Sequence, residues 1–164
     1  MKIALSTDHA GFEQLKELQK FLEELGYQCK YLGPKTFNAH DDFPDYILPA
    51  ARAVAKGECE RGIIMGGSGQ GEAMVANRLT GVRCAVYYGP AVPRRAIDAA
   101  GHHSHDPFSI VRLSRAHNDA NMLSLAARFL NLEEMKGAAR VWLETDFDGN
   151  PDHARRLREM DEAA

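Results

Sequence analysis

Short apolar runs alternate with amphipathic stretches along most of the chain. The first run, residues 2–6, precedes apolar side chains that recur at helical spacing from Phe12 to Leu25. Further strands are expected at 28–32, 61–65, 84–87 and 121–125, and further helices at 46–56, 71–79, 132–143 and 151–160. This alternation predicts an α/β fold, a Rossmann-like three-layer sandwich with a five-stranded parallel sheet, helices on both faces and a C-terminal helix.

One strand runs directly into a glycine-dense loop. The sequence Ile63-Ile-Met-Gly-Gly-Ser-Gly-Gln-Gly-Glu72 indicates a strand, a turn and the start of a helix. Glycines allow several backbone N–H groups to turn inward, and the helix N-terminus adds partial positive charge, so the loop suits an oxyanion or a phosphate. Glu72 would lie beside this loop, where a carboxylate can abstract a proton alpha to a carbonyl while the amides hold the enediolate.

Other interpretations of the same loop remain open. Glu72 can be an ordinary acid in the first helical turn, favoured by the helix dipole after a tight βα turn. The loop has the opening of a dinucleotide-binding fingerprint without its third glycine, and it lacks the Lys-Ser/Thr ending of a P-loop. A nucleotide site is therefore the weaker alternative.

Length and composition narrow the class of protein. The 164 residues, 45% hydrophobic and 26% charged, fit one domain over residues 1–164. A net charge of −3 with scattered cations gives no basic surface for nucleic acid. Three well-separated cysteines favour reduced thiols over disulfides or zinc, and no signal peptide or apolar span is evident. We expect a cytoplasmic protein that binds neither nucleic acid nor membrane.

An insertion interrupts the alternation at about residues 89–111. It contains three prolines, Arg94, Arg95 and the histidines at 102, 103 and 105. Because the histidine spacing matches no tight ligand pair, an exposed polar loop is favoured over a metal site. The loop can also form a lid over a pocket.

Ligands of open parallel sheets bind beyond the carboxyl ends of the strands. Asp8 and His9 follow the first predicted strand, and the glycine loop follows the third. The segment 115–118 can lie beside the fifth strand. We therefore expect these three segments to converge.

Several motifs together resemble one family. They are residues 6–16, 41–44, 66–72 with 76–78, 81–85 and 114–121, in colinear order. The chain is similar to the ribose-5-phosphate isomerase B and galactose-6-phosphate isomerase family over roughly residues 1–88 and 112–160. The resemblance implies aldose–ketose isomerisation of a sugar phosphate through an enediolate, as a step of carbohydrate metabolism in the pentose phosphate pathway. It implies no metal or other cofactor, and a homodimer, or a tetramer of paired dimers, with active sites shared between subunits.

The resemblance also assigns roles to individual residues. Glu72 matches the base of one branch of the family, whereas other members place a cysteine base at the position of Gly66. The amides of Gly67, Ser68, Gly69 and Gly71 match an oxyanion loop, and the Ser68 hydroxyl can bind substrate. The remaining matches assign ring opening or sugar binding to Asp8, His117 and Asn118, and phosphate binding to His9, Arg128 and Arg156.

Simpler explanations exist for most of these residues. Asp8 is also a plausible helix N-cap, and His9 a turn histidine. Arg128 can be a surface cation, although its guanidinium geometry suits phosphate. A polar helix end accounts for His117 and Asn118.

Two departures from the family pattern concern the phosphate. Asp152 stands where the family usually has an arginine, which puts one phosphate ligand in doubt. Arg94 or Arg95 of the insertion can replace that cation, or the insertion can change the sugar that is accepted. The alternatives to a ribose 5-phosphate isomerase are an isomerase of a tetrose phosphate, hexose phosphate or non-phosphorylated sugar, and a non-catalytic sugar-phosphate-binding module.

Overall fold

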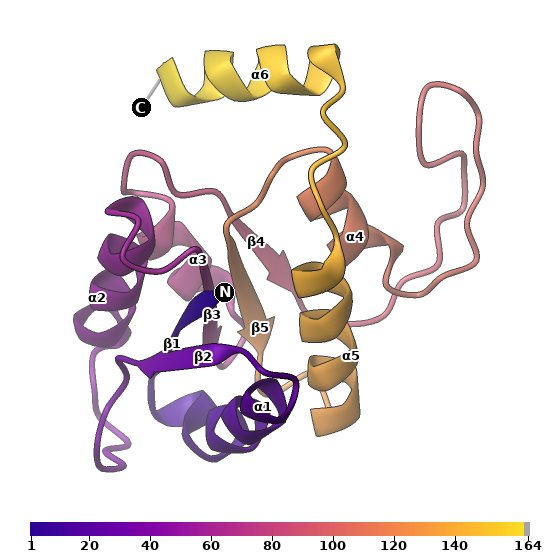
Figure 1. Cartoon of the computed structure of the whole chain (residues 1–164). Coiled ribbons are helices and arrows are strands. Elements are labelled where there is room, and N and C mark those ends of the chain that lie inside the picture. Colours follow the sequence, from indigo (N-terminus) through magenta and orange to yellow (C-terminus); the bar gives the residue numbers. More distant parts are fainter. Residues whose placement is uncertain (163–164) are drawn as a thin grey trace.

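Five parallel strands form one sheet in the computed structural model, which describes residues 1–162 (Figure 1). The strands are β1 (Lys2–Thr7), β2 (Gln28–Tyr31), β3 (Arg61–Gly66), β4 (Cys84–Tyr87) and β5 (Met122–Ala126). Their order is β2-β1-β3-β5-β4. The predicted α/β architecture is confirmed, and every predicted strand is present within one or two residues of its expected bounds.

Over residues 1–162, six α-helices and one short 3₁₀ helix accompany the sheet. They are η1 (His9–Gly11), α1 (Phe12–Glu24), α2 (Phe43–Ala55), α3 (Gln70–Ala76), α4 (Ser109–Ala116), α5 (Leu132–Glu144) and α6 (Pro151–Glu162). We did not predict α4 from the sequence. It is only eight residues long, and its first three residues fall within the segment that we expected to be an irregular insertion.

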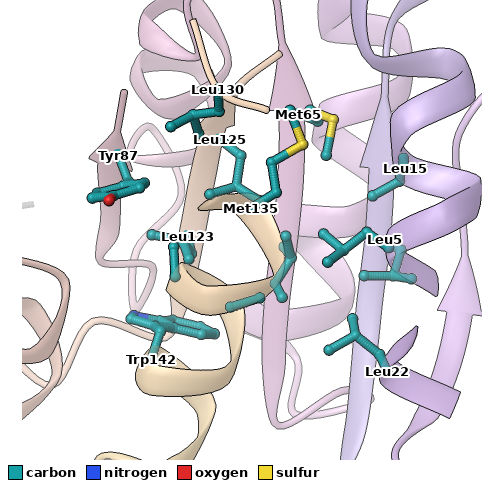
Figure 2. Packing of buried hydrophobic residues seen from close by; sticks show 14 of the residues in the cluster. Leu5, Leu15, Leu22, Met65, Tyr87, Leu123, Leu125, Leu130, Met135 and Trp142 are labelled. Atoms are coloured by element: carbon teal, nitrogen blue, oxygen red, sulfur yellow. The ribbon is translucent and has the colours of Figure 1, made fainter. Parts of the chain in front are cut away.

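The alternation of side chains along the strands builds a core on each face of the sheet. On β1, Ile3 and Leu5 join the cluster under α1 and α5, whereas Ala4 joins the cluster under α2. Figure 2 shows the first cluster, in which Leu15 of α1 and Trp142 of α5 pack against the strands. All of these side chains are fully buried. The two covered faces fix the strands rigidly, and with them the loops at the strand ends.

Two segments lie outside this three-layer body. The predicted insertion is irregular from residue 88 to residue 108, and its last three expected residues belong to α4. It projects as an arm, which is held at its base by a hydrogen bond from the Ala91 N–H to the Pro107 carbonyl (Figure 1). The helix α6 has no buried residue and crosses the amino-terminal side of the sheet, where Arg83 pairs with Asp161 at 3.1 Å. Among the described residues, no helix is long and apolar enough to cross a membrane.

Candidate active site at the glycine loop

The glycine loop connects β3 to α3 through a left-handed turn. Gly69 has a φ of 73°, a conformation that L side chains rarely adopt, and it is the N-cap of α3. The buried Ser124 of β5 donates a hydrogen bond to the Gly69 carbonyl at 2.7 Å. This contact anchors the turn to the neighbouring strand, so the loop has one defined shape.

Glu72 lies in the first turn of α3 with only 5% of its surface exposed. Its carboxyl group occupies the space beside Gly66, because a Cβ built on Gly66 would lie 2.0 Å from both Cδ and Oε1 of Glu72. Burial raises the pKa of the Glu72 carboxyl above its usual value, and the nearby Asp8 raises it further. The Glu72 backbone N–H and His9 act in the opposite direction.

A pocket of about 300 Å³ opens at this loop. It brings together seven of the predicted site residues, from the ends of β1, β3 and β5. They are Asp8, His9, Gly67, Ser68, Gly71, Glu72 and Arg128, with Ala10 and Phe43 completing the wall. Gly69 does not line this pocket and shapes the turn instead.

Asp8 and His9 are fixed by local hydrogen bonds. The Asp8 carboxylate accepts a hydrogen bond from the Ala10 N–H at 2.8 Å, so Asp8 is the N-cap of the 3₁₀ turn η1, whereas Gly11 is the N-cap of α1. The Nδ1 atom of His9 lies 2.7 Å from Asp41 and 3.7 Å from Asp8. The side chain of Asp41 is 2% exposed, and the sequence alone predicts no role for it. Its contact commits Nδ1, so Nε2 is the nitrogen of His9 left for a ligand.

Arg128 follows β5 and stands over the glycine loop. Its backbone N–H donates to the Gly67 carbonyl at 3.1 Å. Its guanidinium carbon lies 3.5 Å from the Cβ position of Gly67. The side chain is exposed, so a guanidinium group is available at the mouth of the pocket.

The other predicted site residues lie elsewhere in the chain. His117, Asn118 and Arg156 line a second pocket of about 240 Å³ with His153, Leu157 and Met160 of α6. The expectation that the segment 115–118 converges with the glycine loop is therefore wrong within one chain. His117 precedes β5, so it lies at the amino end of a strand, whereas the glycine loop lies at a carboxyl end.

A charged turn holds His117 and Asn118 in place. Asp119 has a φ of 42° and pairs with Arg115 at 2.7 Å and with Arg83 at 2.9 Å. Arg115 is only 2% exposed and also donates to the Ala120 carbonyl. These contacts fix the chain between α4 and β5.

The structure also places Asp152 and the two arginines of the insertion, the residues in which this chain departs from the family pattern. Asp152 forms an ion pair with Arg155 at 2.5 Å, whereas Arg156 lines the second pocket. Arg95 lies in a groove between the arm and α4, and neither Arg94 nor Arg95 is among the described residues that line the glycine-loop pocket.

Comparisons with known proteins identify the family. A sequence model of the Ribose/Galactose Isomerase family matches residues 3–102 and 95–160, and the two matches meet within the arm. Ribose-5-phosphate isomerase B of Escherichia coli is 32% identical, covering 95% of this chain and 91% of that protein. The solved structure of ribose-5-phosphate isomerase B from Clostridium thermocellum is 34% identical, with a TM-score of 0.84 and coverage of 99% and 97%.

A second similar structure contains a ligand. Ribose-5-phosphate isomerase B from Mycoplasma genitalium, solved with bound ribulose 5-phosphate, is 28% identical over 99% of this chain and 95% of that one, with a TM-score of 0.84. The strand order, the colinear motifs and the full-length similarity agree. The chain therefore belongs to the Ribose/Galactose Isomerase family and is an aldose–ketose isomerase, an intramolecular oxidoreductase.

Proposed function

We propose that the protein interconverts ribose 5-phosphate and ribulose 5-phosphate through an enediolate, with Glu72 as the base. The observation that carries this proposal is the buried carboxyl group of Glu72, which fills the space beside Gly66 at the edge of the glycine loop. In the family members with a cysteine base, that base stands at the position of Gly66. The two arrangements therefore deliver a proton acceptor to the same place.

The chemistry follows from the groups around this carboxylate. Glu72 removes a proton from C2 of the open-chain aldose and returns it to C1, while the proton of the C2 hydroxyl moves to the C1 oxygen, which leaves the ketose. The amides of the loop and the Ser68 hydroxyl stabilise the negative charge that develops on the substrate oxygen. A raised pKa suits this role, because the group must accept a proton and then release it within one turnover.

Substrate binding requires both pockets. His9 and Arg128 bind the phosphate at the first pocket, with Asp8 on the sugar ring. We infer that a homodimer places His117 of the partner subunit opposite this pocket, together with Asn118 of the partner subunit. Symmetry supports the inference, because an isologous interface that joins the first pocket of one subunit to the second pocket of the other does so twice.

This chain departs from its family at α6, which the resemblance expects to contribute further cations to phosphate binding. Asp152 removes a cation from α6 and neutralises Arg155, so fewer positive charges remain there to recognise a phosphate. An altered substrate, such as a tetrose or hexose phosphate, is therefore the second candidate.

A coupled assay over a panel of aldose and ketose phosphates tests the proposal. We expect the highest kcat/KM with ribose 5-phosphate and competitive inhibition by inorganic phosphate. Variants Asp152→Arg and Arg94→Ala/Arg95→Ala show whether α6 or the arm sets the preference. A higher kcat/KM for a four- or six-carbon phosphate would replace the proposed substrate, and absence of turnover with the whole panel would refute the proposal.

A further inference from the structure

Two histidines and an aspartate meet beside the second pocket. His117 is the C-cap of α4, Asp148 lies between α5 and α6, and His153 is in the first turn of α6. Their candidate ligand atoms all lie within 4.8 Å of one another. The Oδ2 atom of Asp148 is 2.9 Å from Nδ1 of His153 and 3.9 Å from Nε2 of His117.

Backbone contacts hold this cluster together. The Asp148 N–H donates to the Ala116 carbonyl at 3.0 Å, which fixes the aspartate next to the end of α4. The Asn150 N–H donates to Oδ1 of Asp148 at 2.9 Å. The imidazole rings of His117 and His153 stack with centroids 4.3 Å apart. Three ligands from separate segments are therefore brought to one point by the fold.

The geometry is close to that of a tetrahedral metal site. Two nitrogen or oxygen ligands at about 2.0–2.1 Å from zinc are separated by about 3.3 Å. The His153–Asp148 separation of 2.9 Å is near this value, and Nε2 of His117 needs to approach Oδ2 of Asp148 by less than about 1 Å. Two imidazoles and one carboxylate are ligands that zinc prefers, and the adjoining pocket has room for a water molecule as the fourth ligand.

Solvent reaches the cluster, and its net negative charge favours the binding of a cation. The side chains of His117, Asp148 and His153 are 26%, 32% and 18% exposed, respectively. Asp148 supplies a negative charge that two neutral imidazoles do not cancel. Arg156 lines the same pocket and opposes a cation, but its side chain is exposed and can turn into solvent.

We propose that His117, Asp148 and His153 bind a zinc ion and that this ion inhibits the isomerase. The metal takes the Nε2 electron pair of His117, which then cannot assist ring opening, and it occupies the space into which the sugar would enter. The inhibitory part rests on the proposed function, whereas the binding site itself does not. Zinc and the sugar phosphate therefore compete.

Isothermal titration with zinc chloride tests the binding site in the full-length protein. We expect one zinc ion per chain, with affinity at least about tenfold weaker in Asp148→Asn and in His153→Gln. His102→Gln is the matched control, because His102 also contacts an aspartate, Asp98 at 2.6 Å, but lies in the arm. Absence of zinc binding, equal affinity in all variants, or a loss confined to His102→Gln would overturn the proposal.

Activity measurements test the inhibition separately. Zinc should inhibit turnover of ribose 5-phosphate by the wild type, EDTA should restore it, and substrate should weaken zinc binding in the titration. Inhibition should require about tenfold more zinc in Asp148→Asn and remain unchanged in His102→Gln. Zinc binding without inhibition of an active enzyme would overturn the inhibitory role. Zinc binding by a protein that turns over no sugar phosphate would instead refute the proposed function and leave the metal site in place.

Discussion

Replacing Gly66 with alanine tests the geometry around the proposed base. The added Cβ would lie 2.0 Å from the Glu72 carboxyl carbon and Oε1, whereas ordinary contacts begin at 3.4 Å, so the carboxyl group must move by about 1.4 Å. A displacement of about 1 Å from a productive position can cost about 10²-fold in rate. We therefore expect kcat of Gly66→Ala to fall by about that factor with ribose 5-phosphate as substrate.

A double-mutant cycle shows whether this loss acts through Glu72. In Gly66→Ala/Glu72→Gln, the alanine should add almost nothing to the loss that Glu72→Gln causes alone, because both changes disable the same group. Gly89→Ala is the control, since a Cβ there meets no atom within 4 Å. Melting temperatures report whether each variant folds. An active Gly66→Ala enzyme, or losses that multiply in the double variant, would refute the reasoning.

Three further predictions concern charge and assembly. Because the pKa of Glu72 is raised, its ionised form destabilises the folded state above that pKa. Glu72→Gln should therefore raise the melting temperature at pH 7, and this gain should disappear as the pH falls through the Glu72 pKa. An equal gain at all pH values would contradict this prediction. Asp41→Asn should raise KM for the sugar phosphate about tenfold, because it removes the hydrogen bond that holds His9. Asp42→Asn, at an exposed neighbouring position, should leave KM unchanged. Equal KM values in the two variants would argue against a role for the contact between Asp41 and His9. Activity should return to about one quarter of wild type when inactive Glu72→Gln and His117→Asn chains are mixed and exchange subunits. Half of the dimers then contain one chain of each kind, and each of these dimers has one intact shared site. No recovery of activity despite subunit exchange would exclude shared sites.

The sequence was sufficient to predict the strand pattern and the position of the glycine loop beside Asp8 and His9. Apolar runs such as residues 61–65 alternate with helices whose buried residues recur at helical spacing, and this pattern reflects burial on both faces of a parallel sheet. The glycine loop and Asp8 follow strands directly, so local spacing was enough to place them at one edge of the sheet.

Other features depend on packing that no local pattern contains. The position of His117 is set by α4, which is only eight residues long and begins at the end of a proline- and histidine-rich segment, so we did not expect a helix there. The strand order places β5 between β3 and β4, and this order is not encoded in the spacing of the strands. The contact of Asp41 with His9 spans 32 residues, and that of Asp148 with Ala116 joins the loop between α5 and α6 to the end of α4. Contacts of this kind join residues that are far apart in the sequence, so only the folded structure reveals them.

The kcat of Glu72→Gln on ribose 5-phosphate tests the central claim most directly, because the substitution preserves the shape of the buried side chain and removes its ability to accept a proton. We predict a fall of about 10²–10⁴-fold relative to wild type, in a protein that folds and still binds the sugar phosphate. A kcat equal to that of the wild type would contradict the assignment of Glu72 as the base.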